Sequence, residues 1–238
     1  MKPTRTSRLM GTLLLFGMAN SGAAQVMGYT SCTVEDPSSF VAAITTFWDA
    51  MSHVDASNRP TAMINQTLWN GGAPGTHSIA AHYADYAAWE DSRARIGANA
   101  AAWTRLGNSI SAVAECPFEA LFVRLGSWGT TDADWEYYAV YGLRISDIRA
   151  YMEAFAEFAE SDTMNAAPGP VELWQHRAGA AQGPTHFVNF HAPSFSALNA
   201  FIDSLGQSED YADFVDEVES IRTVGIASQY RRIMTLEP

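Results

Sequence analysis

The sequence predicts an α+β fold built from two tandem copies of one β-α-β-β-α-β unit. The clearest sign is a short repeat at an offset of 109 residues, in which residues 76–82, THSIAAH, match residues 185–191, THFVNFH. Further matches keep the same order in both halves. The same offset aligns Ile96-Gly97 with Leu205-Gly206. An offset of 111 aligns four residues near the start of each half: Val34, Asp36, Phe40 and Phe47 with Ile145, Asp147, Tyr151 and Phe158. Their common order indicates an internal duplication.

The first copy begins with a predicted strand over residues 28–34. Asp36 and Pro37 are typical N-cap and N1 residues, so they predict the start of a helix whose apolar residues follow at helical spacing. Two strands separated by the turn Asn70-Gly71-Gly72, a long helix and a last strand complete the copy. We expect these four elements over residues 61–69, 76–83, 85–106 and 111–125.

The second copy follows the same plan. A strand over residues 135–145 precedes a helix with Asp147 as its N-cap, and Pro168-Gly169-Pro170 breaks the chain before the next strand. Pro193-Ser194 then opens a helix that ends near Leu205 and resumes at Tyr211. The strands around these segments are expected over residues 171–177, 185–191 and 223–234.

The first 24 residues have the composition of a secretory signal peptide. A basic start precedes a short apolar run, and small residues lead up to a cleavage site before Gln25. Because the apolar run is too short to span a bilayer, we expect an exported protein, periplasmic or extracellular. The expected organisation is a signal peptide over 1–24, one repeat over 25–130, a linker over 131–133 and a second repeat over 134–238.

The chain is acidic, with 14 basic and 26 acidic residues and a formal net charge of −12. Lys2, in the leader, is its only lysine. Phosphate binding needs clustered Lys and Arg, so the composition argues against a nucleic acid or an anionic membrane as a partner. The lack of lysine after the leader excludes Schiff-base chemistry. We interpret the dispersed acids as a solubility feature, with residues 209–219 as the solvent-facing side of a helix.

Two fused units of this kind, each with a histidine-bearing third strand, resemble the dimeric α+β barrel superfamily. It includes the antibiotic-biosynthesis-monooxygenase-like, stress-responsive barrel and NIPSNAP-like families. The resemblance covers the chain after the leader and rests on topology and duplication. It implies two ferredoxin-like repeats packed as an intrachain α+β barrel, with helices outside and a small-molecule pocket in each sheet. Members range from cofactor-free oxygenases and isomerases to haem enzymes, so the fold leaves the activity open.

Cys32 and Cys116 are the only cysteines. In an oxidising compartment an even count favours a disulfide over a thiol nucleophile or metal ligands, and the alternative is two free buried cysteines. The strand order 4-1-3-2, which the resemblance implies, makes the first and last strands of a repeat neighbours. Cys32 falls on the first strand and Cys116 on the last, so we expect a bridge between them.

The histidines are the only candidates for repeated chemistry. Because a strand alternates its faces, His82 and His191 lie on the face opposite to His77 and His186. The face of His82 and His191 is the more polar one, so we place it in the barrel interior. Both become catalytic candidates, for proton transfer or for a hydrogen bond to a ligand. Smaller neighbours beside His82 favour it as the more sensitive position. The alternative is that both histidines cap strand ends.

Six further residues are candidates for lining a pocket: Asn65, Trp69, Ser78, Trp174, Gln175 and Asn189. Aromatic residues on half-buried strands are more often part of the core, which is the alternative for the two tryptophans and for Tyr138. No third ligand accompanies the histidines at zinc spacing, so we predict no metal site. The resemblance leaves haem ligation by His176 or His191 open, but the sequence has no haem-specific feature and we predict no cofactor.

We therefore predict an exported barrel protein that binds a small, largely apolar molecule. Two alternatives stay open. One is a cofactor-free monooxygenase or isomerase that uses His82 or His191 as an acid/base. The other is a structural or interaction module whose pockets are filled by side chains. An open cavity beside either histidine separates the first two hypotheses from the third. Self-association is also open.

Overall fold

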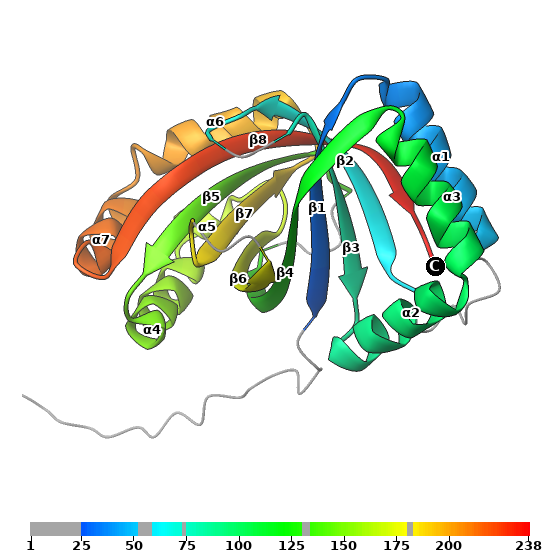
Figure 1. Ribbon diagram of the computed structural model, residues 1–238. Helices are drawn as coiled ribbons and strands as arrows, with labels where there is room; N and C mark the ends of the chain where they lie inside the picture. The colour runs from blue at the N-terminus through cyan, green and yellow to red at the C-terminus, as the bar shows by residue number, and fades with distance from the viewer. Residues whose placement is uncertain (1–24, 52–58, 73–74, 130–133, 180–182) are drawn as a thin grey trace, which may run out of the picture.

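A computed structural model describes residues 25–51, 59–72, 75–129, 134–179 and 183–238. The expected signal peptide and the linker over 131–133 lie outside these residues. Within them, eight antiparallel strands close into one barrel with helices around it (Figure 1). The strands are β1 (Val26–Val34), β2 (Thr61–Trp69), β3 (His77–Tyr83), β4 (Ala114–Trp128), β5 (Tyr137–Ile145), β6 (Val171–Gly179), β7 (His186–Ala192) and β8 (Arg222–Leu236).

The strand order is the same in both halves of the chain. Around the barrel it reads β1-β3-β2-β8-β5-β7-β6-β4, so each half contributes its fourth, first, third and second strands as neighbours. β2 pairs with β8 and β4 pairs with β6, both antiparallel, and these two pairings join the halves. The α+β class and the barrel expected from the sequence are confirmed.

Helices cover the outside of the barrel on two sides. Figure 1 shows α1, α2 and α3 against one side and α4, α6 and α7 against the other. The helices of the described residues are α1 (Pro37–Ala50), α2 (Tyr86–Ala98), α3 (Ala100–Ser111), α4 (Ile148–Ala159), α5 (Asp162–Asn165), α6 (Phe195–Leu205) and α7 (Glu209–Val218). None of these helices combines the length and apolar character needed to cross a membrane.

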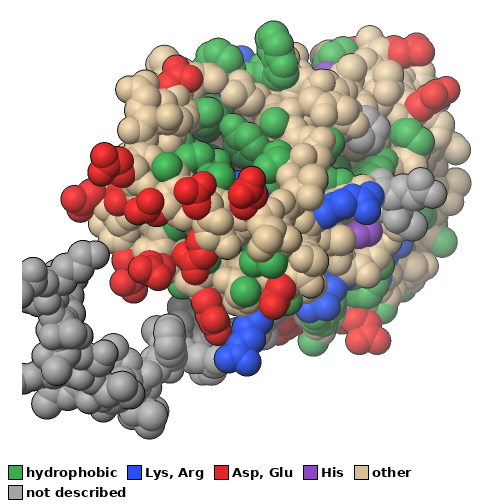
Figure 2. All heavy atoms as spheres, turned by 90° about the vertical axis from the view of Figure 1, so that its left-hand side faces the viewer, with side chains coloured by type: hydrophobic (Ala, Val, Ile, Leu, Met, Phe, Trp, Pro, Cys, Tyr) green, Lys and Arg blue, Asp and Glu red, His purple; other side chains and the backbone are tan. Residues whose placement is uncertain are grey.

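Acidic side chains gather over the end of the molecule where α4 and α7 lie (Figure 2). On α7 the acids are exposed, whereas Phe214 and Val218 of the same helix are buried against the barrel. The acidic segment 209–219 is therefore the solvent-facing side of an amphipathic helix.

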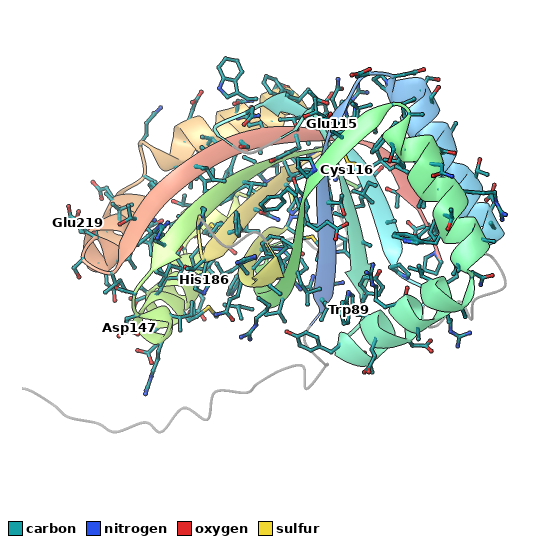
Figure 3. The ribbon with its side chains drawn as sticks, viewed as in Figure 1. Trp89, Glu115, Cys116, Asp147, His186 and Glu219 are labelled. Carbon is teal, nitrogen blue, oxygen red and sulfur yellow. A yellow bond between two sulfur atoms is a disulfide. The ribbon has the colours of Figure 1, made fainter. Side chains whose placement is uncertain are left out.

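The helix starts follow the capping residues of the sequence. Asp36 accepts a hydrogen bond from the backbone N–H of Ser39 at 3.1 Å, and Asp147, labelled at the start of α4 in Figure 3, accepts one from Ala150 at 3.1 Å. Ser194 caps α6 in the same way. These side chains satisfy backbone donors that the first helical turn leaves unpaired, which fixes where each helix begins.

The expected single helix over 85–106 is wrong. The segment forms α2 and α3, which meet at Asn99, a residue with φ −100° and ψ 45°. Gly97 and Asn99 are poor helix formers, so they give the helix a weak point just where the break occurs. Because α3 extends to Ser111, the following strand begins at Ala114 and not at residue 111. The short helix α5 was not expected.

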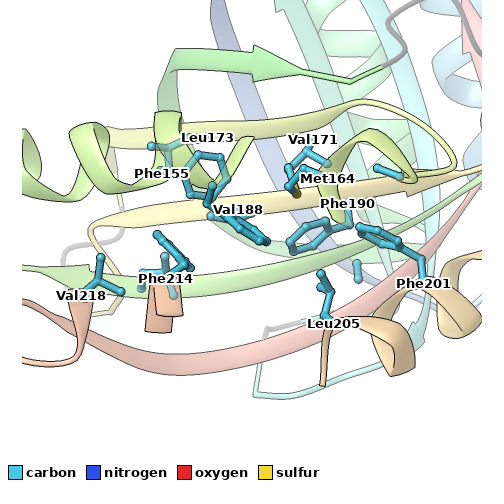
Figure 4. Packing of buried hydrophobic residues seen from close by; sticks show 14 of the residues in the cluster. Phe155, Met164, Val171, Leu173, Val188, Phe190, Phe201, Leu205, Phe214 and Val218 are labelled. Atoms are coloured by element: carbon cyan, nitrogen blue, oxygen red, sulfur yellow. The ribbon is translucent and has the colours of Figure 1, made fainter. Parts of the chain in front are cut away.

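The second half has one continuous core. Phe155, Phe158 and Phe214 pack with residues of α6 and with the outer face of β6 and β7. Figure 4 labels Phe155 and Phe214 of this cluster. His186, Val188 and Phe190 lie on this outer face, as strand alternation requires. The apolar contacts between helices and sheet hold the outer layer in place.

The Cys32–Cys116 disulfide is confirmed and joins β1 to β4, with Cα atoms 4.0 Å apart. Cys116 is labelled in Figure 3. Cys32 is fully buried and packs with Phe40 and Ile44 of α1. The bridge closes a chain segment of 84 residues, so it restricts the unfolded chain strongly.

Removing this bridge lowers the free energy of unfolding. We expect the double variant Cys32→Ala, Cys116→Ala to lose about 4 kcal/mol, because the unfolded chain regains its loop entropy. Urea unfolding of the variant and of reduced wild-type protein measures the loss, and the two should agree. Free-thiol titration of the denatured, unreduced protein should find almost no thiol; two reactive thiols per chain would contradict the assignment.

Candidate functional site

A cavity of about 650 Å³ occupies the barrel interior, and both halves of the chain line it. Ligand sites in proteins commonly have volumes of this order. Much of the wall is aromatic and comes from six of the eight strands: Tyr29, Phe122, Tyr138, Trp174, Phe187 and Tyr230. The interior therefore forms one shared cavity and not the separate pocket in each sheet that the resemblance implies.

His82 and His191 both face this cavity. They come from β3 and β7, one in each half, and alternation turns them inward while His77 and His186 point outward under the helices. His77 and His186 instead contact the preceding threonine hydroxyls, at 3.0 and 2.9 Å from Nδ1. The inward pair is thus the pair available to a ligand.

Glu172 is the centre of the polar end of the cavity. Its Oε1 accepts a hydrogen bond from Arg124 Nη1 at 2.9 Å, and its Oε2 accepts one from Trp174 Nε1 at 3.0 Å. His191 Nε2 lies 3.3 Å from Oε2, in contact but without the alignment of a hydrogen bond. A carboxylate, a guanidinium and an imidazole therefore meet at one point of an otherwise largely apolar cavity.

At this polar end of the cavity, Glu172 is an ionised carboxylate. Burial raises the pKa of Glu172, but His191, His82 and the hydrogen bond from Trp174 oppose that effect and lower the pKa well below its ordinary value. Burial lowers the pKa of His82 to about 4, although the neighbouring Glu172 works in the opposite direction. At neutral pH the site therefore holds an ionised Glu172 beside a neutral His82.

Aromatic rings fix the position of His191. Tyr138 stacks on the imidazole with ring centroids 5.5 Å apart, and Trp135 lies 4.2 Å away. Tyr138 also stacks on Tyr230, at 5.0 Å. Burial raises the pKa of both tyrosines, so their hydroxyls remain protonated. The imidazole is held by packing, which leaves its nitrogens for polar contacts.

Several buried polar atoms around the cavity have no hydrogen-bond partner among the described residues. They belong to four lining residues: Asn65 Oδ1, His176 Nε2, Asn189 Oδ1, and His191 Nδ1 and Nε2. Buried polar atoms are normally satisfied, because an unpaired one costs about 1–3 kcal/mol. Water or a ligand in the cavity would supply the missing partners.

The structure brings together most of the candidate pocket residues. His82, His191, Asn65, Trp174 and Asn189 line the cavity. Ser78 is fully buried behind Asn65, whose amide donates to its hydroxyl at 3.4 Å. The two histidines that the resemblance leaves open as haem ligands, His176 and His191, also face the interior.

Two of the candidate pocket residues lie elsewhere. Trp69, at the end of β2, is 72% exposed and lies outside the cavity lining. Gln175 stands between the inward-facing Trp174 and His176, so alternation puts its side chain on the outer face. Neither residue is in position to contact a molecule in the barrel.

Sequence reasoning missed Glu172 and Arg124. The signal was present for Glu172, since it shares the parity of Trp174 and His176 and interrupts the apolar pattern Val171-Glu172-Leu173 on a predicted strand. No comparable signal marks Arg124, whose partner lies on a strand of the other half. No cluster of three or more His, Cys, Asp or Glu side chains arranged for a metal occurs in the part of the chain that the structure describes.

Comparison with known proteins supports the fold. No family model and no curated protein matches the chain. Two solved structures of proteins provisionally described as monooxygenases are similar. The one from Fusobacterium nucleatum has a TM-score of 0.58 at 13% identity over 90% of this chain and 95% of the other. The one from Lactobacillus acidophilus has a TM-score of 0.57 at 8% sequence identity, and the match covers 90% of this chain and 96% of the other. The structure of an anthrone oxidase-like protein has a TM-score of 0.55 at 12% sequence identity, and the match covers 90% of this chain and 93% of the other. At these identities the likeness shows the fold alone, that of an α+β barrel.

The buried histidines make the fold sensitive to acid. His82 stays neutral in the folded protein down to about pH 4, whereas the unfolded chain takes up this proton near pH 6.5, so acid favours unfolding between these values. The difference is worth about 3 kcal/mol. Glu172 adds its own loss only below its ordinary pKa of 4.5. Urea unfolding at pH 7.5, 6 and 5 should show falling stability, and His82→Gln should make the fall smaller. Part of the fall should remain, because burial also lowers the pKa of His186 to about 4. An unchanged slope in that variant would contradict the assignment.

Proposed function

We propose that this protein binds a small, largely apolar molecule inside the barrel. The observation that carries the proposal is the set of unpartnered polar atoms around an open, aromatic-walled cavity. A barrel that serves only as a scaffold would fill its interior with side chains. Apolar walls with a few placed polar groups are the usual composition of a small-molecule site.

The polar atoms also limit the ligand. Asn65 Oδ1 and Asn189 Oδ1 are acceptors, so a bound molecule that satisfies them carries hydrogen-bond donors. Glu172 is ionised and already paired with Arg124, which disfavours an anionic ligand at this end. The cavity is therefore best suited to a neutral molecule with an apolar body and at least one hydroxyl or amine N–H group.

The proposal includes export and duplication. The composition of residues 1–24 and the disulfide support an oxidising compartment outside the cytoplasm. The common strand order of the two halves and their paired N-caps, Asp36 and Asp147, support descent of residues 25–130 and 134–238 from one ferredoxin-like unit. The cavity would then have formed where the two copies face each other.

Native mass spectrometry tests the binding proposal. Protein purified from its own host should carry a small molecule that is released on denaturation. Returned to stripped protein, this molecule should bind His191→Ala about tenfold more weakly or worse, because a hydrogen-bonding group is lost. The variant also loses buried packing against Trp135 and Tyr138, so its melting temperature should fall, as that of the control variant below does. The contact with Glu172 favours His191 over His82 as the more sensitive position.

His186→Ala is the matched control. It removes a histidine from the same strand, but on the outer face, so it should lower stability and leave affinity unchanged. The absence of a released molecule would contradict the binding proposal. Unchanged affinity of a released molecule for His191→Ala would mean that His191 is a structural core residue.

A second candidate function is acid/base catalysis without a cofactor, as an oxygenase or isomerase. One contact favours it: His191 Nε2 lies beside the ionised Glu172, so an N–H at Nε2 is the favoured tautomer. The other nitrogen, Nδ1, is then free to accept a proton from a bound molecule. Glu172 would stabilise the imidazolium that forms, in the role an orienting carboxylate plays beside a catalytic histidine.

Hydrogen exchange into the released molecule separates catalysis from binding. In deuterated buffer, with metal and flavin removed, wild-type protein should exchange an acidic proton of the molecule for deuterium, detected as a mass increase. His191→Ala and Glu172→Gln should slow this exchange at least a hundredfold, the usual scale of general-base catalysis. If the exchange rate is equal in wild type, both variants and buffer, the protein binds the molecule but has no acid/base activity toward it.

A further inference from the structure

A second cavity lies outside the barrel in the first half of the chain. It has a volume of about 390 Å³ and separates α1, α2 and α3 from the outer face of the sheet. Its floor contains Ile79, Ala81 and Leu121 of the sheet, and its sides come from apolar residues of the three helices. Trp89, labelled in Figure 3, belongs to the side formed by α2. We refer to this cavity as the outer groove.

The outer groove exists because the two halves pack differently. In the second half the helices and sheet form one continuous buried cluster (Figure 4). In the first half the buried residues separate into a cluster around Phe40 and another around Val26, with the groove near both. α3 buries none of its residues fully, and Trp103 is 43% exposed. The first half therefore keeps apolar surface that its own side chains do not cover.

Two arginines line the groove. The guanidinium of Arg59 is 5.0 Å from the ring centroid of Trp48, and that of Arg93 is 6.0 Å from that of Trp103. Trp103 is in edge contact with Phe47, the neighbour of Trp48, at 5.6 Å, so both arginines belong to the same region. Neither pairs with a carboxylate among the described residues. The only acid of the described lining is Glu119, on β4.

We propose that the outer groove binds an amphipathic carboxylate of the fatty-acid type. An alkyl chain would cover the exposed Trp103 and the half-buried isoleucine side chains of the groove, and its carboxylate would meet Arg59 and Arg93. Guanidinium groups suit this role, because they bind carboxylates through paired N–H donors and stack on aromatic rings at the same time. In a chain with a net charge of −12, two arginines that pair with no carboxylate among the described residues are a specific attraction for an anion at an apolar groove.

The barrel interior differs from the outer groove in its charged groups: Arg59 belongs to the lining of both, but Arg93 lines only the groove and Glu172 only the interior. Its Arg124 is already paired with Glu172, whose negative charge would repel a carboxylate. The outer groove and the interior cavity therefore differ in the charge of the ligand that they accept. This inference stands apart from the proposed function of the barrel interior, and either can fail without the other.

Quenching of tryptophan fluorescence by bromine-labelled dodecanoate tests the inference below its micelle concentration. Trp48, Trp89 and Trp103 line the groove, so binding should quench emission, and unlabelled dodecanoate should reverse it. Dodecanol should bind about tenfold more weakly than dodecanoate. Arg93→Gln should weaken dodecanoate binding about tenfold and remove the difference from dodecanol. Arg95→Gln is the matched control, since Arg95 lies on the same helix but pairs with Asp91.

Two neighbouring alanines of β3 locate the bound chain. Ala81 lines the outer groove and Ala80 lines the barrel interior, so Ala81→Phe should abolish binding and Ala80→Phe should preserve it, with melting temperatures confirming that both variants fold. Arg93 is exposed, so its variant serves if either alanine variant does not fold. The inference is overturned if dodecanoate does not bind, if Ala80→Phe alone abolishes binding, or if Arg93→Gln leaves the affinity unchanged.

Discussion

The pairing of β2 with β8 and of β4 with β6 is the interaction on which the rest of the molecule depends. It turns two four-stranded sheets into one closed surface, so no strand edge is left open and the inner faces enclose a common space. These pairings bring residues of the two halves together in the barrel wall. Arg124 on β4 reaches Glu172 on β6 because their strands are neighbours across the junction of the two halves.

The buried charge pair shows what this closure permits. An isolated carboxylate in an apolar interior would take up a proton, because removing the charge from water is very costly. Glu172 stays ionised because His191 and Trp174 of its own half and His82 of the other half lower its pKa. The other half also supplies the hydrogen bond from Arg124. The polar end of the cavity is thus a joint product of both halves. Isolated halves would lack it.

The sequence predicted the elements well wherever local chemistry decides them. Asp36, Asp147 and Ser194 cap helices as expected. Strand alternation, together with the more polar character of their face, placed His82 and His191 inside the barrel. It was weaker where long-range pairing decides. Glu172 is paired with Arg124, and no local sequence pattern connects two residues on strands so far apart in the chain. The break at Asn99 follows from helix propensity, and the outward position of Gln175 follows from strand alternation, so both are local features of the sequence.

The unequal packing of the two halves has a consequence for how the native state fluctuates. Regions with few buried contacts open at a lower free energy than the global unfolding transition, whereas a continuous core opens only with it. We therefore expect the second half, with its phenylalanine cluster, to open only when the whole protein unfolds. α2 and α3 meet at a break at Asn99 and bury few of their side chains. We expect these two helices to open and close at a lower free energy than global unfolding, while the barrel and its disulfide stay intact. Solvent and solutes can therefore exchange beneath these helices through partial opening, on a timescale independent of global unfolding.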